Sequence, residues 1–515
     1  MRNKINAAFL HPFFWTAFPI LYFYARNQNE LGLSIILWPL IISLIGVTVL
    51  LGLTRWLLGT EKGGLFSTIL VMWIFFYGAL VSPFRQFQVV VSNAVIGSNK
   101  IFIPLGLAFL IGWGWYLKKT NKSFERINFY LYLTSAFLLI FQLISVVGSQ
   151  MVNPIPDRTQ ISINQTGVQE YEPDIYYIVL DMFAGEKPLG DVYNYTNRSF
   201  LTFLEDKGFK VIENATSNYA FTEVSLPSSL NMVYLDEIIE RSKPKNNNPR
   251  PMYDLLDNPQ VWSFLKDRSY KIFNFSSVWG PLENPKGADE NLGTSKTISI
   301  LGSKFKINEF YMVFLQTTAL SPVIRNSLRD QTRLQLMYPF EQLPELARLP
   351  GKKFVFAHVA LPHPPYLFDA QGEAISDTEL AMIGDDFTDK EHYLAQLQFT
   401  QNKTMDMIEK LLTNSKTQPV IVLQSDHGPS SILGNPNKWA KPFDPAGISE
   451  RMHILNAYYL PQGGDKMLYP SITPVNTFRI VFNYYFKTDL KLLPDKNYFS
   501  DLKSIYEFTD VTGKF

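Results

Sequence analysis

Cysteine is absent from this sequence, which excludes disulfide bonds as a source of stability anywhere in its 515 residues. An excess of charge is absent too, because the formal net charge at pH 7 is +1 and charged residues make up 18% of the chain. The charge is unevenly spread: residues 1–150 hold little of it outside short basic clusters, whereas the remainder has a globular composition. Neither part has the character of a nucleic-acid binder, so we expect no nucleic-acid partner.

Long apolar runs occupy the charge-poor part of the chain. Five stretches near the roughly 20 residues that cross a bilayer lie at 9–25, 33–53, 65–82, 101–117 and 127–147. A signal peptide followed by buried core helices is the alternative, but the later stretches lack cleavage-site chemistry. We therefore predict an N-terminal bundle of five transmembrane helices, the first of them weakened by Pro12 and Pro19.

Basic residues beside these stretches predict the orientation of the bundle. One side of the membrane carries Arg2, Lys4, Arg55, Lys62, Lys118, Lys119, Lys122 and Arg126, and the other carries Arg26, Arg85 and Lys100. The side richer in Lys and Arg faces the cytoplasm as a rule. After five crossings the rest of the chain is expected outside the cytoplasm, attached to the cell (inner) membrane by a multi-pass domain.

A polar connector and an α/β domain follow. We assign 1–150 to a transmembrane domain, 151–172 to a linker rich in Pro, Asn and Gln, and 173–515 to an extracytoplasmic catalytic domain. Three apolar runs of this domain read as buried strands that end in polar residues: "DIYYIVLDMFAG", "KKFVFAHVALPHPPY" and "PVIVLQSDHGPSS". Helical spacing over 391–412 places a helix between the last two strands. This alternation predicts a mostly parallel sheet flanked by helices.

The ends of these strands supply carboxylate and imidazole groups, which are ligands for zinc or manganese. The candidates are Asp181, His358, His363, Asp426 and His427, with His453 further along the chain. An isolated Asp-His dipeptide is more often a satisfied loop pair than a ligand pair. The gathering of four of the six histidines in or shortly after such segments favours a divalent metal site, and the ligand types suit Zn and Mn equally.

Hydroxyl groups are concentrated in the stretch "SNYAFTEVSLPSSLN" (217–231). A neutral hydroxyl is a poor nucleophile, and the stretch contains no lysine, arginine or histidine to activate it. A divalent cation bound by the Asp/His residues would lower the pKa of such a hydroxyl. The alternative is that these hydroxyls merely cap a helix that begins near Pro227.

These motifs, in this order behind five membrane helices, resemble the alkaline phosphatase/sulfatase superfamily. Within it the chain is most similar to the membrane-bound phosphoethanolamine transferases and lipoteichoic acid synthases. The resemblance covers residues 1–150 as architecture and about 170–487 as motifs. It implies a metal-dependent enzyme with a phospholipid donor and a cell-envelope glycan or lipid acceptor.

Residue by residue, the resemblance names Thr222 as the nucleophile, with Ser225 and Pro227 completing its motif. It implies that Asp181, Thr222, Asp426 and His427 hold the metal ion, although the transferases usually have glutamate at the first position. It implies that His358 and His363 bind the transferred phosphate or a second ion. His453 is the one candidate for a further downstream histidine, and its spacing fits poorly.

Three functions remain open at this point. The first is transfer of a phosphoethanolamine or phosphoglycerol type head group through a Thr222-linked intermediate; Ser228 stands where the phosphoethanolamine transferases have cysteine, which leaves the head group open. The second is a sulfatase or phosphodiesterase type hydrolase, in which Ser225 would be the converted nucleophile, although Ser229 replaces the arginine of the sulfatase signature. The third is a catalytically silent membrane scaffold.

Overall fold

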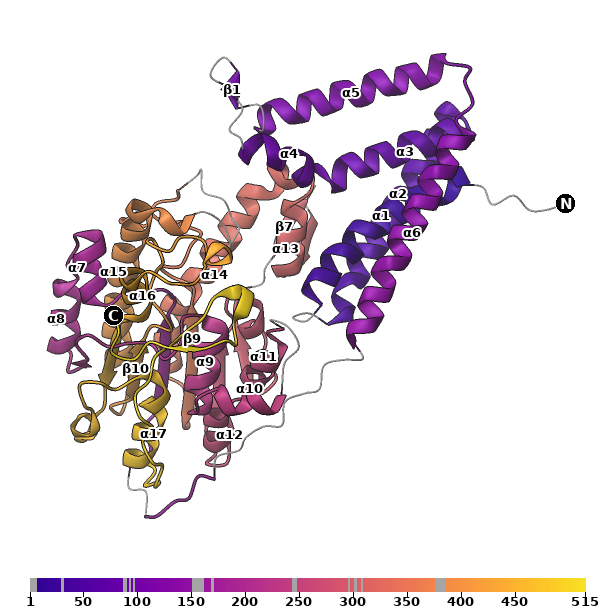
Figure 1. Ribbon diagram of the computed structural model, residues 1–515. Coiled ribbons are helices and arrows are strands. Elements are labelled where there is room, and N and C mark those ends of the chain that lie inside the picture. The colour runs from indigo at the N-terminus through magenta and orange to yellow at the C-terminus, as the bar shows by residue number, and fades with distance from the viewer. Residues whose placement is uncertain are drawn as a thin grey trace. The chain divides into compact units, whose positions relative to one another are not determined.

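A computed structural model describes residues 7–28, 32–86, 90–91, 94–95, 98–150, 162–167, 171–242, 248–294, 297–300, 303–306, 309–375 and 386–515. The chain divides into two compact units (Figure 1). The first comprises Met1–Asn153 and Lys296–Leu328, and the second comprises Pro154–Ser295 and Arg329–Phe515. Inclusion of residues 296–328 in the first unit was not expected from the sequence.

The first unit is helical. Its helices are α1 (Ala7–Asn27), η1 (Leu33–Ile36), α2 (Leu37–Leu58), α3 (Thr60–Phe75), α4 (Tyr77–Gln86), α5 (Asn99–Lys119), α6 (Glu125–Gln150) and α13 (Glu309–Gln316). It also holds the strand pairs β1 (Val90–Val91) with β2 (Ala94–Val95), and β7 (Thr297–Ile300) with β8 (Ser303–Lys306). Helix α14 (Ser321–Leu346) begins in this unit and ends in the second.

Among the described residues, three helical segments are long and apolar enough to cross a membrane: Leu33–Leu58, Asn99–Lys119 and Glu125–Val147. A fourth span results if Thr60–Phe75 and Tyr77–Phe84, which meet at 57°, are counted as one. The structure therefore confirms three or four of the expected spans and does not show five.

Helix α1 covers the first expected span and is not among these candidates. It is far more buried than α5, and its His11 bonds to the Thr68 hydroxyl at 2.6 Å and to the Asn128 side chain at 2.8 Å. A helix enclosed by other helices can carry such polar groups because its neighbours satisfy them, whereas a lipid-facing helix cannot. Enclosure therefore explains how α1 can carry these polar groups.

The second unit contains a seven-stranded sheet of order β4-β11-β10-β3-β9-β5-β6. Its strands are β3 (Ile175–Leu180), β4 (Lys210–Val211), β5 (Lys271–Phe275), β6 (Glu290–Leu292), β9 (Lys353–Val359), β10 (Val420–Gln424) and β11 (Asn456–Tyr459). The five strands from β10 to β6 are parallel, and β11 and β4 continue the β10 edge in antiparallel pairing. The prediction of a mostly parallel α/β sheet is confirmed, as are its three predicted strands.

Every residue of β3, β9 and β10 is buried, as expected for parallel strands covered on both faces. The helices of this unit are α7 (Glu186–Tyr193), α8 (Arg198–Asp206), α9 (Thr222–Asn231), α10 (Asp236–Ser242), α11 (Arg250–Asp257), α12 (Gln260–Lys266), α15 (Lys390–Asn414), α16 (Pro445–Met452) and α17 (Pro474–Tyr485). Short 3-10 turns lie at η2 (Gly280–Leu282), η3 (Asp386–Thr388), η4 (Pro436–Lys438), η5 (Gly464–Met467) and η6 (Leu502–Ser504), and β12 (Tyr498–Phe499) pairs with β13 (Thr509–Asp510). The helix predicted over 391–412 is α15.

Candidate metal and nucleophile site

Two neighbouring strands deliver the acidic residues of the site. Asp181 follows β3 directly and Asp426 follows β10 after one residue, and β3 and β10 pair in parallel with Gln424 opposite Val179. Parallel strands end at the same edge of a sheet, so the two carboxylates meet there. One ligand atom from each of Asp181, Asp426 and His427 lies within 4.8 Å of the others, and all three residues are buried.

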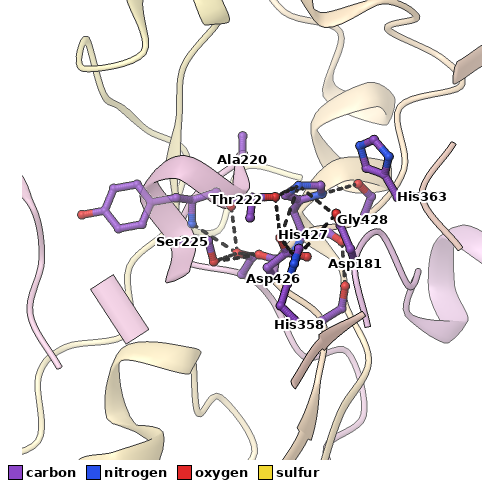
Figure 2. A network of polar contacts seen from close by, with 12 residues as sticks. Asp181, Ala220, Thr222, Ser225, His358, His363, Asp426, His427 and Gly428 are labelled. Carbon is purple, nitrogen blue, oxygen red and sulfur yellow. Dashed lines mark hydrogen bonds and ion pairs between the residues drawn. The ribbon is translucent and has the colours of Figure 1, made fainter. Parts of the chain in front are cut away.

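Thr222 is the first residue of α9 and points into this group (Figure 2). Its hydroxyl donates to Asp426 Oδ2 at 2.7 Å, and its Oγ1 lies 3.0 Å from His427 Nε2. Helix α9 therefore begins five residues before Pro227, and neither Thr222 nor Ser225 caps it through a side chain. The capping interpretation of these hydroxyls is wrong, because tertiary contacts with Asp426 engage both of them.

The tautomer of His427 follows from its hydrogen bonds. Its Nδ1 lies 3.1 Å from the carbonyl oxygen of Gly428, a group that can only accept, so Nδ1 carries the proton. The lone pair of Nε2 is thereby turned toward Thr222 and Asp181. Burial, reinforced by the nearby charge of Arg451, lowers the pKa of His427 to about 3, which keeps the imidazole neutral and able to bind a metal ion.

The pKa values of the two carboxyl groups are shifted in opposite directions. Burial, together with the neighbouring charge of Asp426, raises the pKa of Asp181 well above its ordinary value. Burial would also raise the pKa of Asp426, but the nearby imidazoles and the hydrogen bond from Thr222 outweigh it and keep that pKa well below its usual range. Asp426 is thus the more acidic member of the pair, and Asp181 keeps its proton to a higher pH.

The residues present fit a divalent cation. Asp181 Oδ1 and His358 Nε2 are buried without a hydrogen-bond partner, and such atoms are costly unless a ligand satisfies them. Both face the same group: His358 Nε2 lies 3.6 Å from Asp181 Oδ2 and 3.8 Å from Asp426 Oδ2. Two carboxylates and a neutral imidazole are a donor set for Zn²⁺ or Mn²⁺. Asp181, Asp426 and His427 would hold the ion, with Thr222 beside them.

His358 extends the site from the neighbouring strand β9. Its Nδ1 lies 3.0 Å from the Ser277 hydroxyl and its ring lies 5.9 Å from the ring of Trp279, contacts that hold Nε2 toward the carboxylates. His358 is therefore brought together with the three candidate ligands, as expected from its place in the second of the three predicted strands.

The other candidates occupy different positions. His363 lies at the edge of the site (Figure 2); its Nδ1 contacts the Pro364 carbonyl oxygen at 2.5 Å, and burial lowers its pKa to about 4. Ser225 donates to the backbone carbonyl of Asp426 at 2.8 Å, so it positions the loop and not the carboxylate. His453 is not brought into the group: its Nδ1 lies 2.8 Å from the Ser449 carbonyl oxygen and its ring packs edge-on against Phe515.

Arg451 is a site residue that sequence reasoning missed. Its guanidinium is buried and donates to the carbonyls of Ala220 and Gly428 and, at 3.2 Å, to His427 Nε2. Phe221 and Trp439 flank it, with ring centroids 5.3 and 5.6 Å from Cζ. Burial lowers the pKa of Arg451 to about 10, so it remains a cation beside the acidic residues. The segment "SERMH" gave no local sign of this, because α16 places the arginine in the site only through packing.

No protein-family model and no curated protein matches the sequence. Among solved structures, the C-terminal periplasmic domain of EcEptC from Escherichia coli is 11% identical, with a TM-score of 0.43, and the match covers 70% of this chain and 97% of that one. The integral membrane lipooligosaccharide phosphoethanolamine transferase A (EptA) from Neisseria meningitidis is 12% identical over 93% of this chain and 95% of that one, with a TM-score of 0.40. A putative sulfatase, yidJ from Bacteroides fragilis, is 14% identical over 66% and 83%, with a TM-score of 0.39.

The structural neighbours are phosphoethanolamine transferases and sulfatases, of the alkaline phosphatase/sulfatase superfamily. These are the proteins that the sequence motifs resemble. Because these TM-scores lie below 0.5, the chemistry assigned to the site is argued from the residues of this chain and not from its structural neighbours.

Proposed function

We propose that this protein is a membrane-anchored, metal-dependent transferase that moves a phosphoryl-linked head group from a phospholipid to an acceptor hydroxyl. The observation that carries the proposal is the position of Thr222 Oγ1, within 3.0 Å of both a buried carboxylate and a neutral imidazole of the same metal-ligand group. A hydroxyl with a purely structural role would not need buried carboxylates and a neutral imidazole around it.

In the first half-reaction Thr222 Oγ attacks the phosphorus of the head-group ester. The bond from phosphorus to the diacylglycerol oxygen breaks, and the threonine becomes a phosphodiester. Asp426 Oδ2 already accepts the hydrogen bond of the hydroxyl and so orients the attacking oxygen. Its lowered pKa makes it a weak base, so the hydroxyl proton passes to solvent, and the diacylglycerol oxygen takes up a proton as it leaves. A Zn²⁺ or Mn²⁺ ion in the site would lower the pKa of the Thr222 hydroxyl and offset the charge of the phosphoryl group.

The remaining groups bind and orient the phosphate. We assign the free Nε2 of His358 to a phosphoryl oxygen, with Ser277 holding the ring, and His363 to the rim of the same site. Arg451 supplies a fixed positive charge close to the reacting atoms, where low polarity makes such a charge effective. In the second half-reaction an acceptor hydroxyl attacks the phosphorus and releases Thr222.

The membrane helices explain how the enzyme meets a lipid donor. We propose that α1 is the fifth crossing, enclosed by the others. The chain is then organised as residues 1–150 in the membrane, 151–172 as linker and 173–515 as catalytic domain, apart from residues 296–328, which belong to the first unit. The basic residues at 118–126 then lie in the cytoplasm and the site lies outside it. A cell-envelope glycan or lipid is the acceptor class that this location provides.

Mass spectrometry of the covalent intermediate tests the proposal. We expect full-length, metal-loaded protein, incubated with phosphatidylethanolamine or phosphatidylglycerol, to carry an added head-group phosphate on Thr222. Thr222→Val preserves the shape of the side chain and should abolish both the adduct and diacylglycerol release, since loss of a covalent nucleophile costs several orders of magnitude in rate.

Ser225→Ala is the matched control, because Ser225 lies one helical turn from Thr222 and its hydroxyl contacts Ser217 and the backbone, but not the carboxylate, of Asp426. It should remain substantially active. An adduct or a formylglycine at Ser225 would favour the sulfatase type of chemistry. Diacylglycerol release with free head-group phosphate would indicate a hydrolase, and folded, metal-loaded protein inactive on every lipid class would indicate a scaffold.

A further inference from the structure

Residues 309–323 are rich in apolar side chains yet lie far along the chain from the predicted membrane spans, and they belong to the first unit. Phe310 and Phe314 of α13 join an apolar cluster with α1, η1 and α6. Their rings lie 5.1 and 5.6 Å from that of Phe23, and the Tyr311 hydroxyl donates to the Ile35 carbonyl at 2.9 Å. Helix α13 is therefore built into the helical unit that contains the candidate spans (Figure 1).

The turn after α13 completes a broken membrane helix. In a continuous helix the N–H of Gly78 would donate to the carbonyl of Ile74, but α3 ends at Phe75 and α4 begins at Tyr77. Instead, Gly78 N–H donates to the Thr317 carbonyl at 2.8 Å, and the Ile74 carbonyl accepts from Ala319 N–H at 2.9 Å.

This exchange of backbone hydrogen-bond partners matters because the break lies within the apolar stretch 65–82, which is expected to lie in the hydrocarbon of the bilayer. An unsatisfied backbone group in hydrocarbon costs several kcal/mol. The approach is close enough to require glycine, since a Cβ on Gly78 would lie 2.8 Å from the Thr317 oxygen. Residues 317–319 thus supply the hydrogen bonds that the bent pair α3 and α4 lacks.

The same segment exposes large apolar side chains: Val313 is 37%, Leu320 46% and Val323 80% exposed. They continue an apolar unit whose candidate spans α5 and α6 expose many residues of the same kind, such as Ile111 at 73%. Lipid is the surrounding that fits both sets, because a segment whose backbone is hydrogen-bonded to the backbone of a membrane helix lies at the depth of that helix.

We propose that residues 310–323 are a second membrane attachment, a segment inserted among acyl chains beside the α3–α4 break. The linker is then not the sole tie between membrane and catalytic unit, because α14 carries the chain from this segment directly into the second unit. The inference concerns membrane contact and does not depend on the proposed chemistry.

Absence of cysteine makes the test direct, since each single-cysteine variant carries one label. Val323→Cys, labelled with an environment-sensitive fluorophore in the full-length protein, is reconstituted in phosphatidylethanolamine/phosphatidylglycerol vesicles that contain nitroxide-labelled phospholipid. Ile111→Cys on α5 is the lipid-facing control, and Leu492→Cys, 37% exposed in the second unit, is the aqueous control. We expect quenching at position 323 several-fold above that at 492 and close to that at 111.

Quenching nearer to the Leu492 value than to the Ile111 value overturns the proposal. Protection of position 323 from an aqueous thiol reagent without lipid quenching would reveal a protein neighbour and would overturn it too. In Gly78→Ala the added Cβ would clash with the Thr317 oxygen and displace the turn at residues 317–319, so this substitution should lower the quenching at position 323. Gly112→Ala, whose Cβ meets nothing within 4 Å, should leave it unchanged, and equal effects of both substitutions would contradict the pairing with the helix break.

Discussion

The Thr222 hydroxyl lies 2.7 Å from a carboxylate oxygen of Asp426, although 204 positions separate the two residues in the chain. The contact joins the start of α9 to the carboxyl end of β10. It brings a candidate nucleophile to the candidate ligand group Asp181, Asp426 and His427.

Metal binding should depend on His427 and not on His453. His427→Ala removes an imidazole whose Nε2 faces Asp181 and Thr222, so we expect loss of stoichiometric Zn or Mn from the purified protein. His453→Ala removes an imidazole that contacts the Ser449 carbonyl, and it should retain the metal. Elemental analysis of both variants measures this, and equal metal content in the two would contradict the assignment of the site.

Metal affinity should rise with pH. The raised pKa of Asp181, caused by burial and by Asp426, means that the metal-free site holds a proton that a cation must displace. Below the pKa of Asp181 the affinity should change by about tenfold per pH unit, and the dependence should level off above it. His427, with a pKa of about 3, adds nothing to the slope near neutrality.

Chelator competition over a pH series that begins near the ordinary pKa of aspartate, about 4, and continues upward measures this slope and the pH at which it levels off. Asp181→Asn should bind the metal more weakly and without the slope. The exposed Asp191→Asn should keep the slope of the wild-type protein. An affinity independent of pH in the wild-type protein would show that Asp181 is already ionised.

Arg451→Lys should slow the reaction more than it destabilises the protein. Lysine keeps the charge but cannot reproduce the three contacts with Ala220, Gly428 and His427, so we expect a loss of about 10²–10³ in kcat, as for other buried donors at a developing charge. Arg479→Lys is the matched control, a buried arginine that donates to the Met232 carbonyl. It should lower Tm without a selective loss of kcat, and a loss of kcat of the same size in both variants would count against a role for Arg451 in the reaction.

The orientation of the membrane unit can be tested with reporter fusions. A reporter fused after Gln150 should be extracytoplasmic, and one fused between Lys118 and Arg126 should be cytoplasmic, because the basic-rich side remains inside the cell. The reverse pattern would place the site in the cytoplasm and contradict the lipid-transfer proposal.

Gly428→Ala should destabilise the second unit by about 2 kcal/mol or more. A Cβ at this position would lie 2.2 Å from the Glu450 carbonyl oxygen, which is backbone and cannot move aside cheaply. Gly190→Ala is the control: it lies inside α7 with nothing within 4 Å, and alanine there should stabilise by ~0.5–1 kcal/mol. Thermal unfolding of both variants measures the contrast, and similar shifts in Tm would contradict it.

The sequence alone determined the strands β3, β9 and β10 and the residues at or near their ends. This was possible because a buried parallel strand is a short local run of apolar residues, and because parallel strands bring their carboxyl ends to one edge. Asp181, Asp426 and His358 could therefore be expected to lie together on the strength of their positions in the chain. The five apolar stretches were equally local signals, although length and composition could not show that α1 is enclosed by other helices.

Only the tertiary structure decided which residues outside these runs reach the site. Arg451 enters it and His453, two residues later, does not, because the end of α16 turns one side chain toward Gly428 and the other toward Phe515. The pairing of Thr317 and Ala319 with the broken helix at Gly78 was likewise invisible in the sequence. Backbone hydrogen bonds between segments some 240 residues apart in the chain carry no compositional mark, and they form only because packing brings the two backbones together.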